Sequence, residues 1–117
     1  MVKSNGQSAQ NAVERLISER KWESFHKPRF LVSALMVECG ELMNFCLWKT
    51  PEEIDELFTN QNPDVVKELA DIAINLLSLL KYADLDLNIV VSEKVQELLE
   101  RYDHLPQGTH RGDKGKG

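Results

Sequence analysis

Hydrophobic residues recur every three or four positions in five separate stretches of the chain, a period typical of α-helices with one buried face. In the first stretch, Val13, Leu16 and Ile17 fall on one side of a helix. We find neither the alternation of hydrophobic and polar residues that marks a β-strand nor a repeat of fixed length. The sequence therefore predicts an all-α fold, a bundle of four to five helices. The predicted helices span residues 8–20, 29–48, 51–59, 63–82 and 87–102.

Composition changes sharply at both ends of the helical region. The segment 1–7 is polar, and the segment 106–117 is rich in glycine and basic residues. Neither segment has enough hydrophobic residues to form a core, so both are expected to be disordered. A single helical domain is therefore predicted for residues 8–105.

The helix predicted at 63–82 differs from the others, because residues 69–80 are hydrophobic on nearly every side. A helix of this kind is usually central in a bundle or shared with another subunit. Four short neighbouring helices would not cover it, so we expect a homo-oligomer, either a dimer or a tetramer.

Length and charge exclude several classes of protein. The chain has 117 residues, 42% of them hydrophobic, which suits one globular domain. A net charge of −5 disfavours a protein that grips nucleic-acid phosphates, so no nucleic-acid partner is predicted. The longest hydrophobic run, residues 72–80, is too short to span a bilayer, and the first residues have no hydrophobic signal segment. We expect a cytoplasmic protein without membrane contact.

Two pairs of acidic residues lie inside hydrophobic runs. Glu38 and Glu41 are three positions apart in "ALMVECGELMNF", and Glu68 and Asp71 have the same spacing in "VVKELADIAINLL". Residues three apart lie on the same side of a helix, where like charges repel each other. A single such pair is usually a solvated surface, but two pairs on the helices predicted to be central would place four carboxylates close together. Oxygen ligands of this kind suit Mg²⁺.

A di-iron carboxylate bundle is the other metal site to consider. Such bundles combine glutamates with Glu-x-x-His pairs. None of His26, His104 and His110 lies three residues after a glutamate on the acidic helices, so the sequence disfavours iron.

The spacing of the acidic motifs resembles a known family. The ExxE motif at 38–41, the ExxD motif at 68–71 and the pattern "W..FH.PR.L..AL..E.GEL......W" at 22–48 are similar to the MazG-type nucleoside triphosphate pyrophosphohydrolases, in particular to their dCTP pyrophosphatase branch. The similarity covers about residues 9–106. Asn75 stands where the vertebrate branch often has Tyr, and the C-terminal "N..RYP" pattern is replaced, so the resemblance leaves the preferred base open.

The resemblance implies an enzyme that hydrolyses the bond between the α- and β-phosphates of a nucleoside triphosphate, with dCTP the expected substrate. Monophosphate and pyrophosphate would be the products. Glu38, Glu41, Glu68 and Asp71 would hold Mg²⁺, for which Mn²⁺ could substitute, and Glu38 or Glu41 would act as the catalytic base for the attacking water. The family also implies a homodimer or homotetramer, whereas the sequence leaves open the physiological role, such as clearing non-standard nucleotides.

Further residues are candidates for substrate binding. Lys94 matches a lysine position of the family and would face the phosphates, and Arg29 and Lys81 are further candidates for this role. Trp22 and Trp48 would wall in the base, and hydrogen bonds to the base or sugar would come from His26 and Asn75. Each of these has an ordinary structural alternative, such as a core tryptophan or a solvated lysine.

A function of another class is also compatible with the pattern. The hydrophobic helix at 63–82 could serve a non-catalytic helical protein-interaction module. Release of pyrophosphate from a panel of nucleoside triphosphates would separate the two hypotheses.

Overall fold

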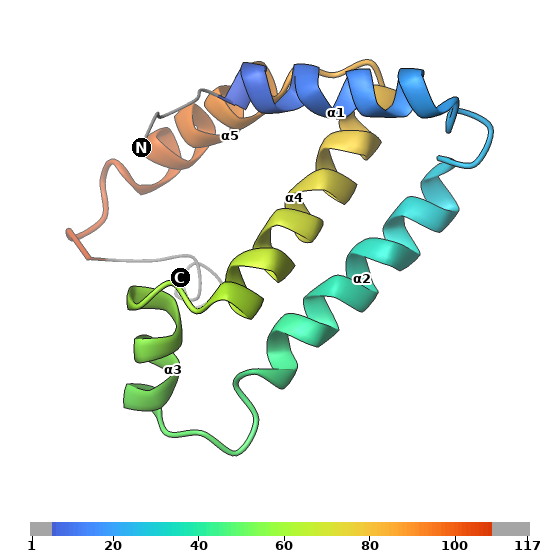
Figure 1. Cartoon of the computed structure of the whole chain (residues 1–117). Coiled ribbons are helices and arrows are strands. Elements are labelled where there is room, and N and C mark those ends of the chain that lie inside the picture. The colour runs from blue at the N-terminus through green and yellow to red at the C-terminus, as the bar shows by residue number, and fades with distance from the viewer. Residues whose placement is uncertain (1–5, 109–117) are drawn as a thin grey trace. The chain divides into compact units, whose positions relative to one another are not determined.

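A computed structural model describes residues 6–108, and every regular element in this range is an α-helix (Figure 1). The prediction of an all-α fold is therefore confirmed. The helices are α1 (Gly6–Arg20), α2 (Pro28–Asn44), α3 (Pro51–Thr59), α4 (Pro63–Tyr82) and α5 (Leu87–Tyr102).

The chain divides into two compact units, the first ending at Leu87 and the second beginning at Asn88. The first unit holds α1 to α4, and the second holds nearly all of α5. Of the two segments expected to be disordered, residues 1–5 and 109–117 lie outside the described part of the chain.

Local signals set the starts of α3 and α4. The Thr50 hydroxyl accepts a hydrogen bond from the Glu53 amide at 3.2 Å, and the Glu53 carboxylate accepts one from the Thr50 amide at 2.8 Å. This capping box satisfies amide groups that have no partner within the helix. At the start of α4, the Asn62 side chain accepts hydrogen bonds from Asp64 and Val65 at 3.0 and 3.2 Å. Proline occupies the first turn of both helices, where its missing N–H is tolerated.

Helix α2 ends earlier than predicted. The predicted end was residue 48, whereas the structure ends the helix at Asn44 and continues through turns. Trp48 has a φ of 63°, in the left-handed region that α-helices do not use. Neither proline nor glycine marks this point in the sequence, so the local pattern gave no sign of the ending.

Helices α2 and α4 lie side by side and run in opposite directions, and α1 packs against α4 (Figure 1). Among the described residues, the buried hydrophobic side chains are Val13, Ile17, Leu31, Val65, Leu77 and Leu80. Gln10 is also buried, and both ends of its amide are satisfied. Its Nε2 donates to the Leu85 carbonyl at 2.7 Å, and its Oε1 accepts from the Leu87 amide at 2.9 Å. These bonds attach α1 to the segment that follows α4.

Much hydrophobic surface stays exposed on the two central helices. On α2, Val32, Met36 and Met43 lie on one side, and about half to two thirds of each is exposed. We call these three residues the α2 apolar face. None of the described helices is long and hydrophobic enough to cross a membrane.

Candidate metal centre and adjoining pocket

Three carboxylates from two helices meet in the first unit. Glu38 and Glu41 come from α2, and Glu68 comes from α4. One oxygen from each lies within 4.8 Å of the others. The spacing of three places both α2 acids on the same side of their helix, and the packing of α2 along α4 brings Glu68 to them. We call these three residues the carboxylate cluster; among residues 6–108 no other group of this kind occurs.

The cluster contains polar atoms without partners. Glu38 Oε2 and Glu68 Oε1 are both shielded from solvent, and neither has a hydrogen-bond partner. Burying an unpaired carboxylate oxygen is unfavourable unless a cation compensates. The donor set consists only of oxygen atoms, which fits a hard divalent cation. The residues present could therefore hold such an ion.

The close approach of the carboxylates also affects protonation. Glu41 and then Glu38 raise the pKa of Glu68 from 4.5 to about 7, because a protonated Glu68 can donate a hydrogen bond to either neighbour. Partial burial raises the pKa further in the same direction. Near neutral pH, the metal-free cluster therefore retains a proton for part of the time.

The raised pKa predicts how metal-free stability changes with pH. Because the folded state holds this proton more tightly than the unfolded chain, the stabilisation is fully present below pH 4.5 and is lost as pH rises through about 7. In a chelating buffer, the melting temperature should fall more between pH 5 and pH 8 for the unmodified protein than for Glu68→Gln. Equal slopes for the two proteins would contradict the shared proton.

Asp71 is the one predicted ligand that lies outside the cluster. It follows Glu68 by three residues on α4, and its side chain is exposed. The same spacing places Glu38 and Glu41 together on α2, so spacing alone does not decide which acid of α4 reaches them; the rotation of α4 against α2 does. The structure thus brings together three of the four predicted acids.

Two of the predicted substrate residues contact each other in the segment between α1 and α2. The rings of Trp22 and His26 lie 5.5 Å apart between centroids, tilted by 31°. Both residues are half-buried. His26 Nδ1 is shielded from solvent and has no hydrogen-bond partner.

The other predicted substrate residues are distributed over several elements. Asn75 is half-buried on α4, whereas Arg29 is exposed in the first turn of α2. Trp48 is 99% exposed, so it forms no wall of a cavity in the single chain. Lys94 belongs to the second unit, where its ammonium group pairs with Glu97 at 3.1 Å.

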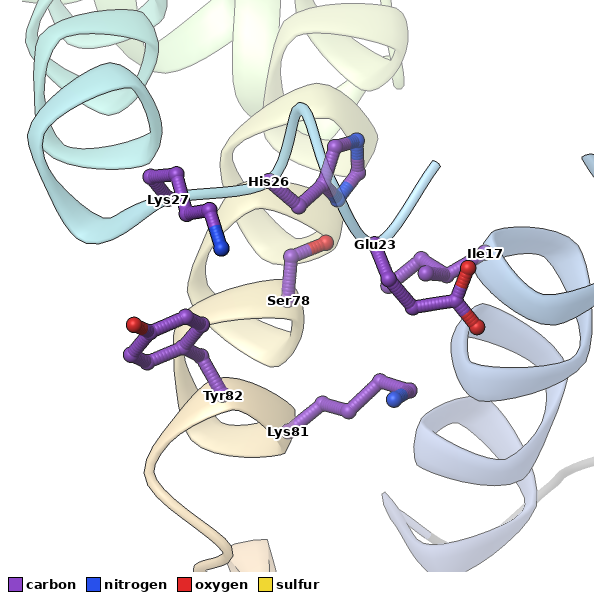
Figure 2. Close-up of a pocket in the computed structure, with 7 residues that line it drawn as sticks. All are labelled: Ile17, Glu23, His26, Lys27, Ser78, Lys81 and Tyr82. Atoms are coloured by element: carbon purple, nitrogen blue, oxygen red, sulfur yellow. The ribbon is translucent and has the colours of Figure 1, made fainter. Parts of the chain in front are cut away.

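A pocket of about 270 Å³ lies next to His26 (Figure 2). Its lining residues are Ile17, Glu23, His26, Lys27, Ser78, Lys81 and Tyr82. Among these, His26 and Lys81 were predicted site residues. Two of the other residues could have been found from the sequence. Polar residues recur along one side of α4 at alternating spacings of three and four. They are Glu68, Asp71, Asn75, Ser78 and Tyr82.

Comparison with known proteins identifies sequences that are similar to this chain. No family model matches the chain. The chain is 35% identical over 97 residues to dCTP pyrophosphatase 1 of Homo sapiens, covering 80% of this chain and 57% of the human protein. The corresponding protein of Bos taurus is 37% identical over 95 residues, with 79% and 56% covered. The chain resembles the dCTP pyrophosphatases. The resemblance predicted from the acidic motifs is confirmed, although the chain spans little more than half the length of these relatives.

A solved structure gives the same fold. A pyrophosphatase from Archaeoglobus fulgidus superimposes with a TM-score of 0.72 at 22% identity, covering 87% of this chain and 98% of the archaeal one. The chain therefore shares the all-α fold of this archaeal structure.

Proposed function

We propose that the protein is a Mg²⁺-dependent nucleoside triphosphate pyrophosphohydrolase that cleaves dCTP and related deoxynucleotides to the monophosphate and pyrophosphate. The carboxylate cluster is the observation that carries this proposal, because its buried and unpartnered oxygens need a cation. Support for the substrate class comes from similarity to proteins named dCTP pyrophosphatase 1.

The acidic residues would have two roles, binding the cation and removing a proton from water. Glu38, Glu41 and Glu68 would hold the cation, with Asp71 as a fourth ligand. A bound Mg²⁺ would supply positive charge to the phosphates and lower the pKa of a water molecule. Glu41 is the most exposed of the cluster, so we assign it the removal of a proton from the attacking water. Glu38 remains a second candidate for this step.

Binding of the rest of the nucleotide would involve residues outside the cluster. We assign Arg29 and Lys94 to the phosphates, since each carries a positive charge. The aromatic residues Trp22 and Trp48, together with His26 and Asn75, would contact the base and sugar. A cytoplasmic location also remains a prediction.

The identity of the products tests the reaction. With Mg²⁺ and dCTP, we expect dCMP and pyrophosphate in equal amounts, because attack at the α-phosphorus expels pyrophosphate as one unit. Chromatography of the nucleotide products, with orthophosphate and pyrophosphate assayed separately, would measure this. Orthophosphate and dCDP as first products would show that another bond is cleaved.

We also propose that the protein is a homo-oligomer, a dimer or a tetramer, with its active sites near the subunit interface. The α2 apolar face supports this, as do Val66, Leu69 and Leu76, which are each 43–46% exposed along one side of α4. Exposed hydrophobic residues that gather on one side of a helix commonly mark contact surfaces.

The same exposed surfaces favour a second candidate function, a non-catalytic module that binds another helical protein. A panel of ribonucleoside and deoxynucleoside triphosphates with Mg²⁺ would decide between the two. Absence of turnover with every triphosphate would favour the interaction module.

A further inference from the structure

A glycine, Gly40, lies in the interior of α2 and is exposed. A helix with glycine in its interior is less stable than one with alanine at that position. Within the described part of the chain, a Cβ atom added at Gly40 would meet nothing within 4 Å outside its own stretch of helix. The packing of the single chain therefore gives no reason for glycine here, because alanine would fit and would stabilise the helix.

Exposed hydrophobic side chains surround Gly40. The positions four and three residues before it hold Met36 and Val37, which are 65% and 57% exposed. Three residues after it, Met43 is 59% exposed, and Asn44 in the next position is exposed as well. Because glycine has no side chain, the centre of this surface is a shallow notch with hydrophobic edges.

A notch of this kind suits the close approach of another helix. Glycine allows two backbones to come together, since no Cβ atom separates them. The side chains around the notch, among them Met36 and Met43 of the α2 apolar face, can then pack between side chains of the approaching helix. The surface therefore fits a helix that itself presents hydrophobic side chains.

The charge of this surface favours one kind of partner. Between Phe30 and Trp48, the only charged residues are Glu38 and Glu41, and both belong to the carboxylate cluster, where α2 meets α4. A basic or acidic partner would therefore find no group to pair with around Gly40. Two copies of this chain, each with a net charge of −5, repel each other, and an uncharged surface is where they can meet. A second copy offers the same uncharged surface.

The direction of the second helix follows from Arg29. This exposed residue precedes Gly40 by eleven positions, which is about three turns, so it lies on the same side of α2. Two parallel helices in contact on this side would bring their arginines together. Two antiparallel helices that meet at Gly40 separate the arginines by about 33 Å along the axis. Repulsion between like charges therefore favours the antiparallel arrangement.

We propose that α2 packs against α2 of a second copy of the chain, antiparallel and with Gly40 at the two-fold axis. The proposal rests on the homo-oligomer proposed above and specifies its contact. In a two-fold contact both subunits use the same surface, so Gly40 lies against its own copy. Met36 then lies against Asn44 of the partner subunit, because the two residues are equally far from Gly40 in opposite directions.

The dissociation constant of the oligomer tests the role of Gly40. Gly40→Ala should weaken self-association at least tenfold, because a symmetric contact receives two methyl groups where the backbones approach. Sedimentation velocity over a dilution series of the full chain measures this. The matched control is Ser18→Ala, at an exposed position of α1 where alanine also favours the helix. Its dissociation constant should equal that of the unmodified protein.

The two cysteines of α2 and the segment after it test the direction. Cys39 is next to Gly40, so in the antiparallel pair the two copies of Cys39 lie close together. Cys46 is six residues from Gly40, which places its two copies about 18 Å apart along the helices. A short bismaleimide cross-linker should therefore give covalent dimers of Cys46→Ser and none of Cys39→Ser, as read on a denaturing gel.

Three results would overturn the proposal. Equal dissociation constants for Gly40→Ala and the unmodified protein would show that the subunits meet elsewhere, without contradicting the proposed oligomer. Covalent dimers of Cys39→Ser, or none of Cys46→Ser, would contradict the antiparallel contact at Gly40. A stable monomer would refute the contact and the oligomer together. Release of pyrophosphate from dCTP is measured separately, so failure of the proposed reaction would leave these results valid.

Discussion

Replacing Glu41 by Gln should lower kcat by about a hundredfold or more, which is the usual contribution of a catalytic base. The same change should remove most of the stabilisation that Mg²⁺ provides, since a ligand oxygen loses its charge. Without metal, the variant should be at least as stable as the unmodified protein, because one of three mutually repelling carboxylates is gone. Turnover of dCTP and melting curves with and without Mg²⁺ measure all three effects.

The size of the Mg²⁺ effect follows from linkage. An ion that binds only the folded state stabilises it by about 1 to 3 kcal/mol at 10 to 100 times its Kd. The control is Glu52→Gln, an exposed acid in the first turn of α3, for which we expect little loss of turnover or of the Mg²⁺ effect. Normal turnover and a normal Mg²⁺ effect in Glu41→Gln would show that Glu41 is not a ligand.

Introducing a charge into the α2 apolar face should dissociate the oligomer. Met36 is 65% exposed at the centre of this face, so Met36→Asp would bury a carboxylate in a hydrophobic contact if two subunits pack there. At micromolar concentration, light scattering should give a dimer or tetramer for the unmodified protein and a monomer or an unfolded chain for the variant. Activity should be lost together with assembly.

A matched variant tests whether position matters. Ser18 is an exposed residue of α1 and does not belong to the α2 apolar face. Ser18→Asp adds the same charge as Met36→Asp. It should leave the oligomer intact. An unmodified protein that is a stable monomer would rule out this interface.

The features that could be predicted from the sequence depend on residues close together in the chain. Helices α4 and α5 have the predicted bounds, and α3 does as well. The hydrophobic period and the capping residues act within a few positions of the chain, so the bounds of these helices can be predicted from the sequence. The end of α2 lacks such a mark, and the prediction for it was wrong by four residues.

Features of the site depend instead on how helices pack. Spacing of three places Glu38 and Glu41 together without any knowledge of tertiary structure. Which of the α4 acids meets them depends on the rotation and register of α4 against α2, and the structure selects Glu68 rather than Asp71. The pocket is harder to predict from the sequence than the cluster, because Glu23 and Tyr82 are nearly sixty residues apart and only packing brings them to one cavity.

The two hydrogen bonds of Gln10 have a consequence for synthesis of the chain on the ribosome. They join α1 to partners 75 and 77 residues later, at Leu85 and Leu87. Domains fold during translation only when all their contacting segments have been made. Helix α1 therefore has to wait, with its buried side chains uncovered, until α4 and the following turn have emerged. The contacts of α1 in the first unit therefore form only after about three quarters of the chain has been synthesised.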